Sequence, residues 1–336
     1  MQLQTAIKYE RGEPWFEDGN IVLLADQSTV AFKVHRGVLS RHSEIFQSMF
    51  QLPPPSQSEY IETVDGCQLV RMYDLPADLS NLIKALYDGP SFQNRSARDF
   101  YDVAGVLRLS NKYFIAHLRS QAIRFLSKTW SCTLRGHDAM LQMALDSHRV
   151  DGLTYPYVHP LHVLKLARET NAQVLVPSAL YFLSLYPLQD ITRGDHPKLQ
   201  VEHPSRPSPE LSAQDLQDYT LMFQHRIDLM LEFVQNVDTA PGAGAMCTNR
   251  QGDCYSVFSR LANVLSRSWL ARTGPLHFMV QAVDQLAEDP TACHPCHRAF
   301  REHVFAKRQQ IWDELPSIVG LPNWEELKAS DLGSQP

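Results

Sequence analysis

The sequence predicts an α+β domain at its amino-terminal end, a small sheet capped by helices, followed by an all-α carboxy-terminal domain. Three short segments before residue 75 carry the alternating or continuous apolar pattern of strands. Most later apolar residues recur at intervals of three and four, as in amphipathic helices. A chain of 336 residues with 44% hydrophobic and 20% charged residues is large enough for about two folded domains.

The first elements are a hairpin and two short helices. Asn20–Ala25 is an apolar strand, and Asp26–Ser28 has the composition of a turn. Thr29–Val34 alternates as the returning strand, so the pair is predicted to form a β-hairpin. The apolar spacing in His35–Ser40 and Ser43–Phe50 predicts two helices directly after it.

One more strand and three more helices complete this domain, to which we assign residues 15–130. Gln51–Glu59 is a predicted loop, because its three consecutive prolines cannot continue a helix or donate to a sheet. Cys67–Tyr73 alternates as the third strand. The helices are marked by apolar residues between 79 and 88, between 100 and 107 and between 118 and 126.

The rest of the chain is predicted to be helical. Residues 131–195 form a helical extension, and 196–210 form an exposed loop with four prolines. Residues 211–328 form the carboxy-terminal helical domain, which starts at a capping box of Ser212 and Asp215. Its first helix places seven residues on one buried face: Leu216, Tyr219, Thr220, Phe223, Ile227, Met230 and Val234. Residues 329–336 are polar and are predicted to be a disordered tail.

Charge and hydropathy favour an intracellular protein, cytoplasmic or nuclear. The formal net charge is −6 and Lys and Arg form no long run, so we expect no direct binding to nucleic acid. The most basic stretch, Arg298–Arg308, also contains an acidic residue and is interpreted as a solvated helix face. No apolar run is long enough to span a membrane, and the first residues lack the apolar core of a signal peptide.

The sequence does not predict an enzyme. It contains no phosphate-binding loop, no dinucleotide-binding glycine pattern, no HExxH metal motif and no GxSxG nucleophile motif. The glycines at 242 and 244 follow the long predicted helix and are interpreted as a stop signal.

Four cysteines make the one candidate chemical site. Cys247 and Cys254 are separated by six residues, and Cys293 and Cys296 by two. A CxxC turn can place two thiolates on one tetrahedral metal ion and a second pair can close the site, so the pattern predicts structural zinc. Free thiols remain an alternative, as does a redox pair or disulfide. His294 and His297 could also serve as ligands, although we interpret them as exposed turn residues.

Several blocks of the first 130 residues carry a family resemblance. Nine residues between 32 and 50 follow the pattern in question: Phe32, His35, Arg36, Val38, Leu39, Ser43, Phe46, Met49 and Phe50. Three later blocks continue it in the same order: Leu82–Asp88, Val103–Tyr113 and Leu118–Leu126. Together they resemble the BTB/POZ domain. The whole chain also resembles fungal BTB proteins with a helical carboxy-terminal half, through Cys293–Cys296, Trp312–Pro316 and Gly320–Trp324.

The resemblance implies a protein–protein interaction scaffold or adaptor that acts through its BTB/POZ domain. Members of this family form homo-oligomers, and some bind a cullin scaffold as substrate adaptors of ubiquitin ligases. We therefore expect protein partners, a homo-oligomer and a cullin as one candidate partner. The alternative is a transcriptional or chromatin co-regulator that is assembled through the BTB domain without direct DNA binding.

Overall fold

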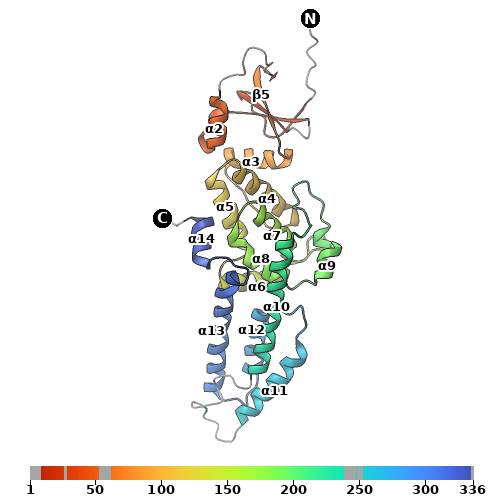
Figure 1. Cartoon of the computed structure of the whole chain (residues 1–336), viewed down its shortest axis with the longest axis vertical. Helices are drawn as coiled ribbons and strands as arrows, with labels where there is room; N and C mark the ends of the chain where they lie inside the picture. Colours follow the sequence, from red (N-terminus) through yellow and green to blue (C-terminus); the bar gives the residue numbers. More distant parts are fainter. Residues whose placement is uncertain (1–8, 26–28, 53–61, 238–246, 248–252, 334–336) are drawn as a thin grey trace.

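The computed structural model describes residues 9–25, 29–52, 62–237, 247 and 253–333. The molecule is elongated, with a small sheet at one end, a body of packed helices in the middle and an arm of long helices at the other end (Figure 1). The predicted loop at 51–59 lies mostly outside the described residues, as does the glycine stop signal at 242 and 244.

The sheet confirms the predicted hairpin and third strand. Leu23 pairs with Phe32 in the antiparallel hairpin and with Val70 in a parallel pair on its other side. The strand order is β1-β3-β2-β5-β4. Two short strands that the sequence did not predict extend the edges. The strands are β1 (Glu10–Arg11), β2 (Ile21–Ala25), β3 (Val30–Val34), β4 (Thr63–Val64) and β5 (Cys67–Met72).

The central strand β2 is buried on both faces. Ile21 and Leu23 belong to the core beneath the helices, whereas Val22 and Leu24 pack on the opposite side against Leu69. This double burial explains why the run NIVLLA is continuously apolar instead of alternating. The helices of this end are α1 (Arg36–His42), α2 (Glu44–Gln51), α3 (Pro76–Asp88), α4 (Ala97–Lys112) and α5 (Ala116–Leu126).

The middle of the molecule is a helical body built around α8. All eight residues of α8, Val176–Leu183, are buried. The other elements of the body are α6 (Leu134–Asp146), α7 (Pro160–Glu169), α9 (Leu188–Arg193) and the 3₁₀ turns Gln173–Leu175 and Pro197–Leu199.

Among the described residues no single helix has the length and hydropathy of a membrane span. One bent pair of helical segments, 173–183 with 188–199, meets the requirement by length and composition only.

The arm is formed by four long helices. The predicted capping box is confirmed, since the Ser212 hydroxyl accepts from the Asp215 amide at 3.1 Å and the Asp215 carboxylate accepts from the Ser212 amide at 3.2 Å. The helices are α10 (Ala213–Asn236), α11 (Asp253–Ser268), α12 (Pro275–Ala287) and α13 (His294–Ile318), followed by α14 (Trp324–Leu332).

The buried face of α10 differs from the predicted one. Tyr219 and Met230 are buried as predicted, but Leu216 is 41% exposed. Arg226, which is not part of the predicted apolar face, is buried. Arg226 donates to the Ser184 hydroxyl and carbonyl and to the Thr273 and Ala271 carbonyls. These bonds orient α10 so that Arg226 faces the helical body. They are needed because the N–H groups of a buried guanidinium must find acceptors.

The proline-rich stretch 196–210 is not a wholly exposed loop. Ser205 is 1% exposed; its hydroxyl donates to the Asp78 carboxylate of α3, and its carbonyl accepts from Arg108 of α4 at 2.7 Å. The ring of His203 stacks on Tyr101 with centroids 5.0 Å apart. We call residues 200–212 the strap, because they tie the helical body back to the amino-terminal helices.

The predicted disordered tail is wrong for residues 329–332, which continue α14. This helix packs on α5 (Figure 1), more than 200 residues earlier in the chain. Asp331 is buried, and its carboxylate accepts from Arg119 at 2.9 Å and from the Val174 amide at 2.8 Å. These bonds give the polar sequence a folded position that local periodicity does not reveal.

Candidate functional site

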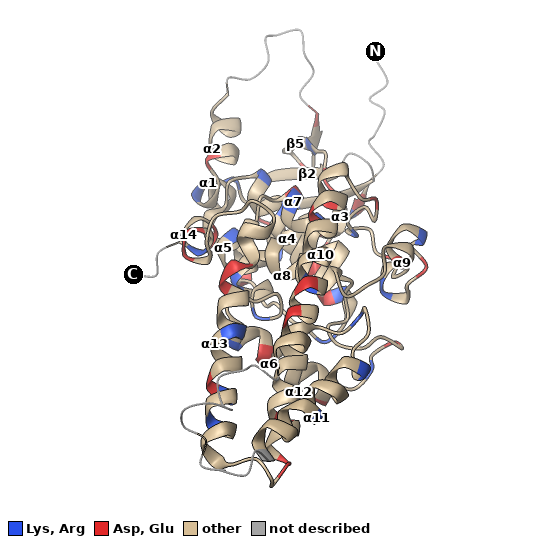
Figure 2. Ribbon diagram, turned by 60° about the horizontal axis from the view of Figure 1, so that its bottom comes forward, with Lys and Arg blue, Asp and Glu red and all other residues tan. Residues whose placement is uncertain are grey.

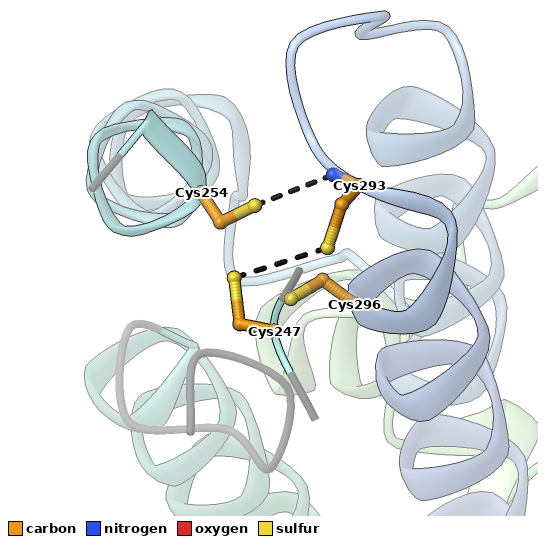
Figure 3. A group of neighbouring side chains, drawn as sticks. All are labelled: Cys247, Cys254, Cys293 and Cys296. Carbon is orange, nitrogen blue, oxygen red and sulfur yellow. Dashed lines mark hydrogen bonds between the residues drawn. The ribbon is translucent and has the colours of Figure 1, made fainter. Parts of the chain in front are cut away.

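The four predicted cysteines converge at the end of the arm that lies far from the sheet (Figure 3). Their Sγ atoms all lie within 4.8 Å of one another. Cys293 is the N-cap residue of α13 and Cys296 lies in its first turn, while Cys254 lies in the first turn of α11. Cys247 comes from the segment before α11. The cluster therefore joins three segments that are separate in the sequence.

The spacing of the sulfur atoms fits a tetrahedral metal site. The Sγ atoms of Cys247 and Cys293 are 3.8 Å apart, and the Cys293 amide donates to the Cys254 Sγ at 3.3 Å. Thiolates at about 2.3 Å from a tetrahedral zinc ion lie about 3.8 Å from one another. A disulfide would need about 2.0 Å between the sulfur atoms, so Cys247 and Cys293 are too far apart to form one. The donor set and the distances thus suit zinc.

Without a positive charge nearby, the surroundings of the cluster keep its buried thiols protonated. Burial raises the pKa of the Cys254 thiol, and burial together with the neighbouring thiols raises the pKa of Cys296. Both residues are buried. A divalent ion supplies the positive charge that stabilises thiolates in such a place. Neither His294 nor His297 is part of the group, and both are helical residues instead of turn residues.

A second candidate site, which the sequence interpretation missed, is an exposed aromatic patch on the amino-terminal domain. Tyr73 is 73% exposed and Phe114 is 68% exposed. The next residue after Tyr73 is hydrogen-bonded to the two residues before Phe114. The Asp74 carboxylate accepts from the Tyr113 hydroxyl, and it accepts from the Lys112 ammonium group at 2.7 Å. We call Tyr73 and Phe114 the aromatic patch.

Phe114 has an unusual backbone for its residue type. Its φ is 51°, in the left-handed region that phenylalanine seldom adopts. The Ile115 amide donates to the Ser110 carbonyl at 2.8 Å, which closes a Schellman motif at the end of α4 with Phe114 in the position that glycine usually takes. A helix that ends without glycine, with only three residues before the next helix, is the sequence signal that points to this position.

The other apolar residues of this region divide between core and surface. Phe46 is buried, while Met49 and Phe50 are half-buried and pack against the same core. Ile45 on α2 is exposed. It lies three residues after His42, whose ring is 5.0 Å from that of His117 at the start of α5.

The comparisons with known proteins bear on the amino-terminal end of the chain. Residues 17–129 match the family model of the BTB/POZ domain. No curated protein matches this chain. The matched span runs from just before β2 to just after α5 and includes the aromatic patch, whereas the cysteine cluster lies outside it. The chain therefore carries a BTB/POZ domain, a protein-interaction domain, at residues 17–129, followed by a mostly helical part.

Proposed function

We propose that this chain is an adaptor whose BTB/POZ domain binds a cullin-type scaffold through the aromatic patch, while the helical part holds a second protein. The protein-interaction role follows from the domain; the partner and the surface are the proposal. The observation that carries it is Phe114, a large apolar side chain exposed to solvent on a strained backbone.

Both properties of Phe114 disfavour it in an isolated domain. A non-glycine residue in the left-handed region costs about 1–2 kcal/mol, which glycine would avoid. An exposed aromatic ring provides apolar surface of the kind that protein partners cover. Strain of this type collects at binding sites, where the surrounding hydrogen bonds over-determine the conformation.

We further propose that the four cysteines hold one structural zinc ion. Four thiolates close the coordination shell and leave no open position, so the ion would stabilise the fold and would not catalyse a reaction. It would connect the first turns of α11 and α13 with Cys247, and so fix the end of the arm. The second protein would then meet a rigid helical surface.

The test is capture of a purified cullin amino-terminal domain by the full-length chain, together with light scattering for its oligomeric state. Phe114→Gly should abolish capture and leave the free energy of unfolding unchanged or raised by about 1 kcal/mol. Tyr255→Ser, which removes a 61% exposed ring from the arm, is the matched control and should capture normally.

Two results would contradict the proposal, and a third bears on the oligomeric state alone. Capture that survives Phe114→Gly would place the contact elsewhere. A wild-type chain that captures no cullin but enriches chromatin proteins would favour the co-regulator alternative. A monomer by light scattering would remove the expected homo-oligomer while leaving the cullin contact to be judged by capture alone.

A further inference from the structure

A groove of about 620 Å³ lies between the end of α5 and helix α14. Arg124, Ser127 and Lys128 line it from the side of α5, and Lys328 and Leu332 line it from α14. The BTB/POZ domain supplies one wall and the last described helix supplies the other. The groove therefore exists only when α14 is docked, through contacts such as Arg119 with Asp331.

The positive charges around the groove outnumber the negative ones. Lys328 is paired with Glu325 at 2.7 Å. Within the described part of the chain, Arg124 and Lys128 contact no carboxylate: Arg124 donates to the Leu332 carbonyl at 2.5 Å and to the Ser120 hydroxyl. Elsewhere on the molecule, basic and acidic residues are interspersed along the helices (Figure 2). The groove itself is lined by three basic side chains, Arg124, Lys128 and Lys328, and by one acidic side chain, Glu325.

We propose that this groove binds an acidic peptide segment of a partner protein. Carboxylates of the segment would pair with Arg124 and Lys128, which line the groove. The inference deepens the proposed adaptor function, on which its biological meaning rests, by assigning the chemistry of the second protein.

The position of the groove suits simultaneous binding of two partners. The aromatic patch precedes the first residue of α5, and the groove lies at its last turn. Eleven helical residues separate Phe114 from the groove by about 16 Å along α5, so the two sites share no residue. A nucleic acid is the less suitable occupant, because its affinity depends on many phosphate contacts and on exposed rings for stacking.

The experiment measures the fluorescence anisotropy of a labelled peptide of Asp, Glu and Ser, titrated with the full-length chain. A peptide with Asn and Gln in place of the acids is the ligand control. We expect the acidic peptide alone to bind, with weaker affinity at higher salt. Lys128→Gln should weaken binding by about fivefold, and Lys128→Gln with Arg124→Gln by more. Lys84→Gln on α3, outside this groove, should change nothing.

Thermal melting of each variant shows whether α14 stays docked, since Arg124 also contacts Leu332. Equal binding of the neutral peptide, or unchanged binding by a folded Lys128→Gln, would overturn the proposal. So would displacement of the peptide by a single-stranded oligonucleotide at lower concentration.

Phe114→Gly separates this inference from the proposed function. It should remove cullin capture and leave peptide binding intact. Loss of peptide binding in this variant would move the peptide to the aromatic patch and overturn the groove. Peptide binding in the groove by a chain that captures no cullin would support the groove and reject the cullin adaptor.

Discussion

The sheet end and the cysteine end of this molecule are held together in different ways. At the sheet end, β2 and β3 are separated by only four residues and pair along their whole length, and the helices that cover them follow directly in the sequence. At the cysteine end, the two pairs lie 46 residues apart from Cys247 to Cys293, and α11 and α12 lie between them. Local pairing builds the first region, and convergence of distant segments builds the second.

Because of this difference, different changes should destabilise the two regions. The sheet end has two apolar cores, one on each face of the sheet. The cysteine end has four thiols that come together around one point. Removal of that point of attachment should therefore affect the arm and leave the sheet in place.

The largest effect that we expect is the loss of the arm when metal is removed. A chelator, or Cys296→Ser, should destabilise the arm by several kcal/mol, because binding energy at a structural zinc site is folding energy. Hydrogen exchange should increase in α11 and α13 but not in β2 and β3. Cys132→Ser is the control, since that cysteine is outside the cluster. An arm that keeps its protection in excess chelator would reject the zinc proposal.

Acid should produce the next largest effect, again in the helical part. Burial lowers the pKa of His137 to about 3, of His159 to about 2 and of His162 to about 4. The folded state holds these rings neutral while the unfolded chain protonates them near pH 6.5, so stability falls as the pH drops from 6.5 toward 4. The upper limit is about 2 kcal/mol for each ring at pH 5.

The pH dependence can be assigned with one substitution. His137→Phe removes a ring whose two nitrogens have no hydrogen-bond partner among the described residues, and it should flatten the curve of unfolding free energy against pH. His303→Phe is the control, because this ring is exposed on α13. A wild-type chain whose helical part is equally stable at pH 5 and pH 7 would contradict the assignment.

The smallest effect concerns the strap, which ties the helical body to the amino-terminal helices. A Cβ atom at Gly105 would lie 2.3 Å from the Asp78 carboxylate that the strap serine contacts. Gly105→Ala should therefore destabilise the chain by about 1–3 kcal/mol and loosen the strap, which limited proteolysis would detect. Gly37→Ala has open space and should be neutral or slightly stabilising. Equal stability of both variants would show that the strap does not depend on this close approach.

Most helices and the three longer strands were predictable because their signals are local. The capping box of Ser212 and Asp215 and the alternation in β3 involve neighbours within a few residues. The zinc prediction also came from spacing, and the structure adds that the four sulfur atoms lie close together. The buried face of α10 was wrong because Arg226 finds its acceptors on α8 and before α12, which no periodicity contains.

By itself, the sequence determined the class of the chain, the order of its elements and the four cysteines as one candidate site. Those features depend on hydrophobic period, turn chemistry and residue type, which are written in short windows. Only the tertiary structure decided that α14 docks on α5, that the strap is buried at Ser205 and that Phe114 is exposed. The first two result from contacts between distant segments, whose free energy is shared by residues that no local window contains.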